Sequence, residues 1–273
     1  MLSRILIAIV GIPLLVYILY FGGLPLFIFT EIVVLIGVHE FFHMSEIGGK
    51  RPNKLVGMGV AFLVPLAVYL TQIKVLEIGT EAVIALGFIV LMTIRVLQNR
   101  VENASVEIGE TMIGALYPSI LFSHCLLISY LPNGGKWLVT AQVMVWVCDS
   151  FAYFTGIACG RKFFNRGFST ISPKKSIEGS IGGTVATILA LAIMDRYLGL
   201  VPDKMSFITV VIFGLFISAV AQIGDLGESM FKREFKVKDS GTILRGHGGI
   251  LDRFDSMLFV APVMYYLLKF MVL

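Results

Sequence analysis

The segment from Asp225 to Asp255 carries side chains suited to phosphate chemistry. Asp225 directly follows an apolar run and Asp252 begins the next one, so both carboxylates are expected at a membrane boundary, where charge is costly and usually functional. Two carboxylates about 4 Å apart repel by roughly 4 kcal/mol at an effective dielectric near 20, and a divalent cation removes that penalty. Because hard oxygen ligands suit Mg²⁺, the pattern predicts a magnesium site at Asp225 and Asp252.

A glycine-rich turn, Gly246-His247-Gly248-Gly249, stands just before a predicted helix start near Asp252. Backbone N–H groups of such a turn at a helix N-terminus bind anions without the help of side chains. The same segment holds cations that could grip phosphate oxygens: Lys232, Arg233, Lys238, Arg245 and Arg253. A plain charged loop is the alternative, but carboxylates, cations and a glycine turn together favour a site for Mg²⁺ and phosphates.

A second cluster precedes it in the chain, as Ser172-Pro173-Lys174-Lys175-Ser176-Ile177-Glu178-Gly179. Adjacent lysines can be simple signals of membrane topology. The Ser-Pro turn and the Glu-Gly helix start indicate a fixed loop, so phosphate binding is an equal alternative.

Asp149 is the third candidate, because an ionisable residue within an apolar span is functional by default. It could serve as a further metal ligand, and the alternative is a hydrogen bond between helices. The nearby pairs Gly156/Gly160 and Gly179/Gly183 have the spacing of closely packed membrane helices.

The elements that position these residues are membrane spans. Only 15% of the 273 residues are charged, against about 25% in soluble domains, and 57% are hydrophobic. This composition excludes a soluble enzyme and a disordered chain, and three cysteines are too few for a disulfide scaffold. Continuous apolar runs predict an all-α polytopic membrane protein with about nine spans. They are residues 5–21, 24–39, 55–71, 82–97, 112–131, 137–156, 180–198, 207–222 and 256–273.

The Lys and Arg residues sort by side of the membrane. With a cytoplasmic N-terminus, most of the 22 lie in cytoplasmic connections, and the exceptions are Lys74, Lys136, Arg196, Lys204 and Lys269. This satisfies the positive-inside rule and, with nine spans, predicts a cytoplasmic N-terminus and an extracytoplasmic C-terminus. The two longest connections, 157–179 and 223–255, then face the cytoplasm together with the candidate site.

Several segments resemble one enzyme family. Ser229-Met-Phe-Lys232-Arg233, Lys238-Asp239 after four further residues, and then Gly246-His247-Gly248-Gly249-Ile-Leu-Asp252-Arg253-Phe-Asp255 resemble the signature of the phosphatidate cytidylyltransferases, the CDP-diacylglycerol synthases of phospholipid biosynthesis. The segments at 172–179 and 149–161 also look like family segments. Arg245 departs from the family pattern, which usually has Pro or Gly there. The resemblance is specific from about residue 140 onward.

The resemblance implies transfer of CMP from CTP to phosphatidate, with release of pyrophosphate. Asp225, Asp252, His247 and Lys174 are then the predicted catalytic residues, with Mg²⁺ on Asp225 and Asp252 and a second cation such as K⁺ as a further expectation. The predicted substrate-binding residues are Ser172, Lys174, Lys175, Lys232, Arg233, Lys238, Asp239, Arg245, His247, Gly248, Gly249 and Arg253. We expect catalysis from residues 137–273, with residues 1–136 as scaffold and oligomer contacts. We also expect a homodimer without nucleic acid, in the inner membrane of a prokaryote.

Two other classes of function stay open from the sequence. His39-Glu40-Phe41-Phe42-His43 is a literal H-E-x-x-H, which on a helix places two imidazoles on one face beside a glutamate that could activate a zinc-bound water. An intramembrane zinc protease is therefore the alternative function, with Asp149 or Asp225 as third ligand. An ion-coupled transporter using the same two aspartates is weaker, since no repeated halves are visible.

Overall fold

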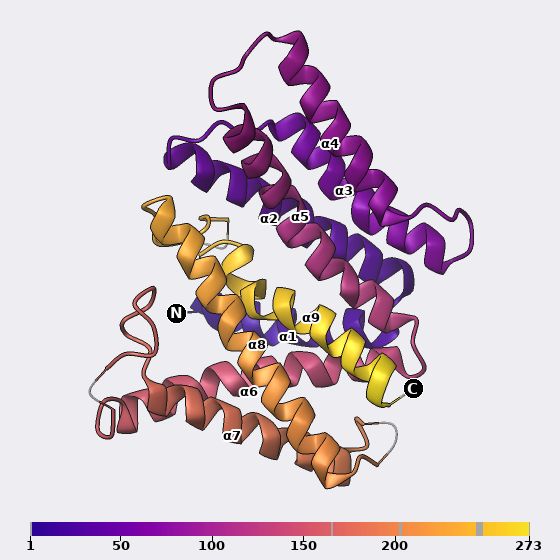
Figure 1. Cartoon of the computed structure of the whole chain (residues 1–273). Helices are drawn as coiled ribbons and strands as arrows, with labels where there is room; N and C mark the ends of the chain where they lie inside the picture. The colour runs from indigo at the N-terminus through magenta and orange to yellow at the C-terminus, as the bar shows by residue number, and fades with distance from the viewer. Residues whose placement is uncertain (1, 165, 202–203, 244–247, 273) are drawn as a thin grey trace. The chain divides into compact units, whose positions relative to one another are not determined.

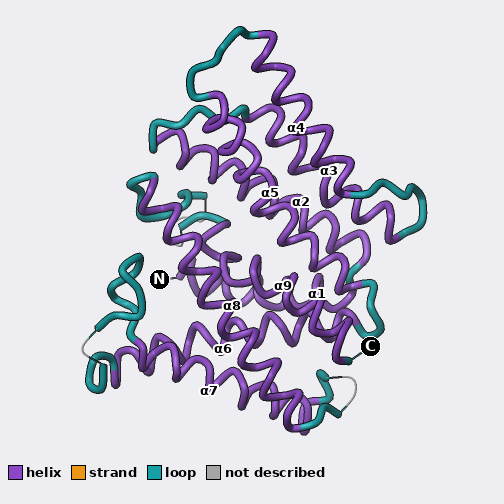
Figure 2. Tube along the Cα trace, in the orientation of Figure 1, coloured by secondary structure: helices purple, strands orange, loops and turns teal. Residues whose placement is uncertain are grey.

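The computed structural model describes residues 2–164, 166–201, 204–243 and 248–272. Within these ranges nine α-helices follow one another, and irregular loops without any strand join them (Figures 1 and 2). A π-helical turn, Met194–Leu198, continues α7. The helices are α1 Leu2–Phe21, α2 Gly23–Ile47, α3 Lys54–Gln72, α4 Thr80–Leu97, α5 Ala104–Ser129, α6 Gly134–Cys159, α7 Ile177–Ile193, α8 Phe207–Glu234 and α9 Leu251–Met271.

The helices have the lengths that a bilayer requires. A span needs about 20 apolar residues, because lipid offers no partner to an unpaired backbone group. Eight helices of the described chain are long and apolar enough to cross a membrane, and in α1 the apolar segment Ile9–Phe21 is shorter. The predicted all-α polytopic architecture is confirmed, and the protein is an integral membrane protein.

Two helices extend further than the apolar runs predict. α8 continues past Gln222 to Glu234, so Asp225, Lys232 and Arg233 lie on a helix and not in a loop. α2 likewise continues past His39 to Ile47. Hydropathy reports where the lipid core ends, whereas a helix continues for as long as its backbone hydrogen bonds are made. The connections are therefore 160–176 and 235–250, both shorter than predicted.

The chain forms two compact units, and α8 and α9 each pass from one to the other. Unit 1 is Met1–Phe21, Leu131–Met230 and Phe254–Leu273, and unit 2 is Gly22–Tyr130 and Phe231–Arg253. In unit 1, α6 packs along α7 and α1 packs against α6 (Figure 1). In unit 2, α2, α3 and α5 pack against one another and α4 packs on α3. The predicted division of roles at residue 136 stays a prediction.

Small residues bring α6 and α7 into close contact in unit 1. A Cβ atom on Gly179 would lie 2.7 Å from the Ala152 carbonyl oxygen, and one on Gly183 would lie 2.8 Å from that of Cys148. These distances leave no room for any side chain. The predicted close packing at Gly179 and Gly183 is confirmed, and it fixes the start of α7 beside the helix that carries Asp149.

Aromatic rings attach the segment Phe231–Arg253 to α2 within unit 2. The buried Phe41 ring lies 5.1 Å from the Phe231 ring and 5.6 Å from the Phe235 ring, both edge to face. Such pairs add roughly 0.5–1.5 kcal/mol to the area they bury. The end of α8 is therefore held against the part of α2 that contains Glu40.

Candidate functional site

A cavity of about 520 Å³ in unit 1 is lined by several of the predicted site residues. The loop before α7 contributes Ser172, Lys174 and Lys175, together with Phe168 and Ser176. The helices contribute Asp149 from α6 and Asp225 from α8. Residues that are more than 70 positions apart in the sequence, such as Asp149 and Asp225, therefore line one cavity.

Both charge signs meet in this cavity. Lys175 forms an ion pair with Asp225, and the two side chains are 34% and 33% exposed. Asp149 interacts electrostatically with Asp225, with Lys175 and with Asp255, which belongs to the same unit. The lysines provide positive charge for phosphate oxygens, and the carboxylates provide oxygen ligands for a cation.

The loop 160–176 is fixed by hydrogen bonds to the start of α7. The Ser176 side chain caps the helix by accepting the Gly179 N–H at 3.0 Å. Glu178, which is 6% exposed, accepts the N–H groups of Phe163 and Phe164, both at 2.9 Å. The Glu-Gly helix start therefore orders the loop, as the sequence indicates, and places the two lysines at the cavity.

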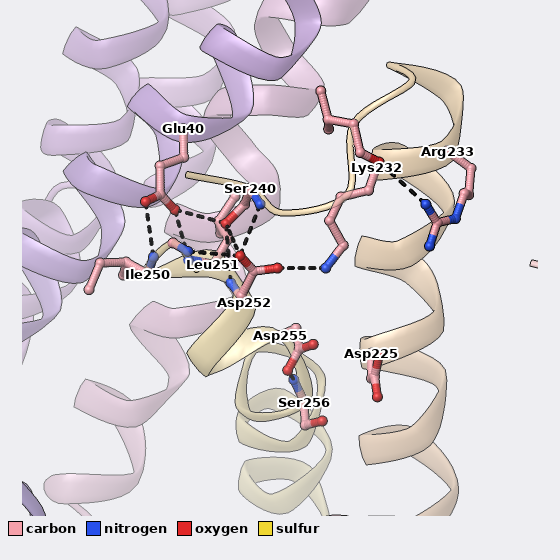
Figure 3. A network of polar contacts seen from close by, with 12 residues as sticks. Glu40, Asp225, Lys232, Arg233, Ser240, Ile250, Leu251, Asp252, Asp255 and Ser256 are labelled. Atoms are coloured by element: carbon pink, nitrogen blue, oxygen red, sulfur yellow. Dashed lines mark hydrogen bonds and ion pairs between the residues drawn. The ribbon is translucent and has the colours of Figure 1, made fainter. Parts of the chain in front are cut away.

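A second group of predicted site residues surrounds Asp252 at the start of α9 in unit 2 (Figure 3). Asp252 Oδ2 accepts the Ser240 N–H at 2.9 Å and the Gly249 N–H at 2.8 Å, while Oδ1 pairs with Lys232 Nζ at 2.6 Å. Gly248 adopts φ +80°, and a Cβ there would lie 2.5 Å from Asp252 Oδ2. The Gly249 N–H therefore donates to Asp252 in this structure and not to a bound anion. A cation bound at Asp252 Oδ1 would compete with the Lys232 ammonium.

Glu40 of α2 joins the same network and is 2% exposed (Figure 3). Its carboxylate accepts the N–H groups of Ile250 and Leu251, each at 3.0 Å. The Ser240 hydroxyl lies 3.1 Å from Glu40 Oε2 and 2.9 Å from Asp252 Oδ2. Because a hydroxyl has one proton, it donates to only one of these carboxylates at a time.

The predicted residues therefore fall into two groups. Unit 1 brings together Ser172, Lys174, Lys175, Asp149 and Asp225. Asp225 and Asp252 belong to different units, so a Mg²⁺ shared between them stays a prediction. Unit 2 brings together Lys232, Gly248, Gly249 and Asp252. Of the other predicted residues, Lys238, Asp239 and Arg253 are exposed, and the Arg233 guanidinium donates to the Val237 carbonyl oxygen. Arg245 and His247 lie outside the described residues.

The donor set suits a cation that needs few protein ligands. Among the described residues no three His, Cys, Asp or Glu side chains are grouped as a metal site. Mg²⁺ keeps several waters and is commonly held by one or two carboxylates together with substrate phosphates. Asp225, with Asp149 in the same cavity, fits that requirement.

Comparison with known proteins identifies the family to which the chain belongs. The profile described as "Cytidylyltransferase family" matches residues 2–271. The chain belongs to this family. The phosphatidate cytidylyltransferase of Bacillus subtilis is 32% identical over 267 residues, covering 97% of each chain. Those of Staphylococcus epidermidis and Staphylococcus aureus are 33% and 34% identical over 266 residues, covering 97% of this chain and 98% of theirs.

The cytidylyltransferase match extends over the whole chain, so it reaches well beyond the C-terminal half in which the resemblance is specific. Several residues of the site were nevertheless not among the predicted site residues. Asp255 ends the family signature three residues after Asp252, on the same helix face, but it was not predicted to have a role. Gln222, which lines the cavity, was visible only as a polar end of an apolar run. Ser240 carried no signal, and Glu40 was noticed for a different chemistry.

The zinc alternative is not favoured in a cytidylyltransferase, and the geometry agrees. His39 and His43 are exposed, whereas Glu40 is buried and accepts the N–H groups of Ile250 and Leu251 at the start of α9. A zinc protease needs that glutamate free to activate water. The H-E-x-x-H spacing therefore reflects a glutamate that the fold uses structurally.

We predict that the double substitution His39→Ala/His43→Ala changes turnover of CTP by less than about 2-fold, as is usual for exposed positions. Metal analysis of the purified wild-type protein should show no stoichiometric zinc. Bound zinc that disappears with the histidines, together with lost activity, would restore the protease hypothesis.

Proposed function

We infer that this protein transfers CMP from CTP to phosphatidate, giving CDP-diacylglycerol and pyrophosphate. The observation that carries this inference is the 32–34% identity to phosphatidate cytidylyltransferases over 97% of the chain. The cavity lined by Lys174, Lys175 and Asp225 supports it, because both substrates are phosphate anions.

The reaction needs positioning more than acid–base chemistry. A phosphate oxygen of phosphatidate forms a bond to the α-phosphorus of CTP, the bond from that phosphorus to the bridging oxygen breaks, and pyrophosphate leaves in line. The attacking phosphate is already an anion near neutral pH, so no strong base is required. The main barrier is repulsion between two polyanions, which fixed positive charges reduce.

We propose that Lys174 and Lys175, with Ser172 on the same loop, bind phosphate oxygens. The pair between Lys175 and Asp225 keeps the ammonium directed into the cavity before substrate arrives. Lys232, Arg233, Lys238, Arg253 and the glycine turn are proposed to hold the remaining phosphate oxygens, on the strength of the family signature. Asp239, Arg245 and His247 complete the proposed substrate set, with His247 a candidate donor to the leaving group.

We propose Mg²⁺ as the cofactor, held by Asp225 and Asp252, with Asp149 as a further candidate ligand and K⁺ as a second cation. Bound Mg²⁺ would neutralise charge on the nucleotide phosphates. The shared cavity of Asp149 and Asp225 supports this for unit 1, and the role of Asp252 rests on the sequence signature.

We further propose that the site faces the cytoplasm of a prokaryotic inner membrane. The bacterial relatives and the distribution of Lys and Arg support this orientation. Acyl chains of phosphatidate then stay in lipid while CTP arrives from water. A homodimer without nucleic acid remains our expectation for the assembly.

The purified protein in phosphatidate-containing micelles should release pyrophosphate from CTP, and the release should require both phosphatidate and Mg²⁺. The lipid product should contain one CMP per pyrophosphate released. Replacing phosphatidate by phosphatidylcholine is the control, since it lacks the free phosphate monoester that attacks. Pyrophosphate release without phosphatidate, or none under any condition, would contradict the proposed function.

A further inference from the structure

Glu40 is a buried carboxylate for which the proposed chemistry has no role. It is 2% exposed, yet each of its oxygens has a hydrogen-bond donor within 3.0 Å. Both of these donors, Ile250 N–H and Leu251 N–H, stand at the start of α9. The first N–H groups of a helix have no partner within the helix, so an acceptor must come from elsewhere. Glu40 supplies it from a helix about 210 residues away in sequence.

The carboxylate also lies against two of the described glycines that precede α9, Gly241 and Gly249. A Cβ atom on Gly241 would collide with Glu40 Oε1, and one on Gly249 would collide with Glu40 Oε2 and with Ser240 Oγ. The two glycines therefore let the backbone close around the carboxylate. At these two positions the absence of a side chain leaves the room that the Glu40 carboxylate occupies.

Ser240 connects Glu40 to Asp252. Its hydroxyl is within hydrogen-bond distance of both carboxylates, and its N–H is held by Asp252 (Figure 3). Asp252 is in turn fixed by the Gly249 N–H and by Lys232. A change at Glu40 is therefore transmitted to Asp252 through one side chain and through the first turn of α9.

We propose that Glu40 is a positioning residue for cytidylyl transfer: it fixes the turn around Ser240 and Gly249 and the start of α9, and thereby the orientation of Asp252 toward the nucleotide phosphates. The proposal rests on the function proposed above. It assigns the N-terminal half of the chain a direct part in organising the site. Outer partners of this kind, when removed, typically cost 10–100-fold in metal affinity or activity.

The test is Glu40→Gln, which keeps the shape of the side chain but loses the charge and one acceptor. We expect kcat for pyrophosphate release to fall by about 10–100-fold and the Mg²⁺ concentration for half-maximal activity to rise. The matched control is Glu46→Gln on the same helix, because Glu46 is exposed and its ion pair with Lys54, at 2.6 Å, is solvent-accessible on both sides. The control should keep wild-type kcat and Mg²⁺ dependence.

A purely structural role would lower the amount of folded protein but leave the kcat per folded molecule and the Mg²⁺ dependence unchanged. That result in a folded Glu40→Gln protein would overturn the proposal. If Glu40→Gln does not fold, Ser240→Ala decides, because it removes only the connecting hydroxyl. Reduced kcat with an unchanged unfolding temperature supports the proposal, and wild-type kcat refutes it.

A double-mutant cycle adds a check that depends on the connection itself. If Glu40 acts through Ser240, the losses in kcat for Glu40→Gln and Ser240→Ala are non-additive, and the double variant is little worse than the more impaired single variant. Fully additive losses would contradict the proposed route. An inactive wild-type protein would instead signal failure of the proposed function, which differs from an active wild type with an unaffected Glu40→Gln.

Discussion

Replacing Asp225 with Asn is expected to lower kcat for CDP-diacylglycerol formation by about 10²–10³-fold, a typical loss when one preorganised charged group is removed from a site. Asp225 lines the cavity and pairs with Lys175. The substitution removes an oxygen ligand for the proposed Mg²⁺ and the partner that directs the ammonium. Because Asp225 is one-third exposed, the neutral isostere should fold normally.

The measurement is pyrophosphate release at saturating CTP and phosphatidate, with the unfolding temperature recorded for each variant. Glu234→Gln is the control, since Glu234 is exposed on the same helix and its described ion pair joins it to the half-exposed Lys50 at 3.6 Å. A solvent-accessible pair with a separation this long contributes little to stability. Turnover near wild type in a folded Asp225→Asn protein would remove Asp225 from the site.

The second large effect is expected from Asp252→Asn, which should lower the free energy of unfolding by about 3 kcal/mol and also abolish turnover. Lys232 and Asp252 side chains are only 10% and 9% exposed. The substitution removes the negative charge that Asp252 places 2.6 Å from the Lys232 ammonium, and the Ser240 and Gly249 N–H groups lose a charged acceptor. Thermal unfolding in detergent micelles and the pyrophosphate assay measure the two effects.

A second substitution separates stability from chemistry at this position. Adding Lys232→Met to Asp252→Asn removes the ammonium that faced Asp252, so part of the lost stability should return, because buried ion pairs can be replaced by neutral side chains at little cost. Activity should not return if Asp252 serves the substrates. Recovery of turnover in the double variant would show that Asp252 acts only by balancing Lys232.

The sequence alone predicted the class of fold and the family correctly. A lipid core demands about 20 apolar residues per span, so the spans can be predicted from continuous apolar runs in the sequence. Each span must be helical, because its backbone hydrogen bonds have to be made within the segment. The close helix packing at Gly179 and Gly183 followed from their spacing in the same way. The C-terminal signature identified the family because many of its positions are specified over a short stretch.

The tertiary structure decided which polar groups meet. Asp149, Lys175 and Asp225 line one cavity because α6, the loop before α7, and α8 pack together in unit 1, and no local pattern connects them. Helix ends beyond the lipid core were also misjudged, since hydropathy carries no information there. This is why Asp225 and Lys232 were expected in a loop and lie on α8.

Glu40 shows the difference most clearly. By itself the sequence determined that a carboxylate stands between two histidines at a helical spacing, which is ambiguous chemistry. Only packing decided that it bonds to N–H groups about 210 residues away and not to a metal. The reason is physical: a hydrogen bond depends on groups within about 3 Å, and distant segments reach that separation only after apolar burial and close helix contact have brought them together.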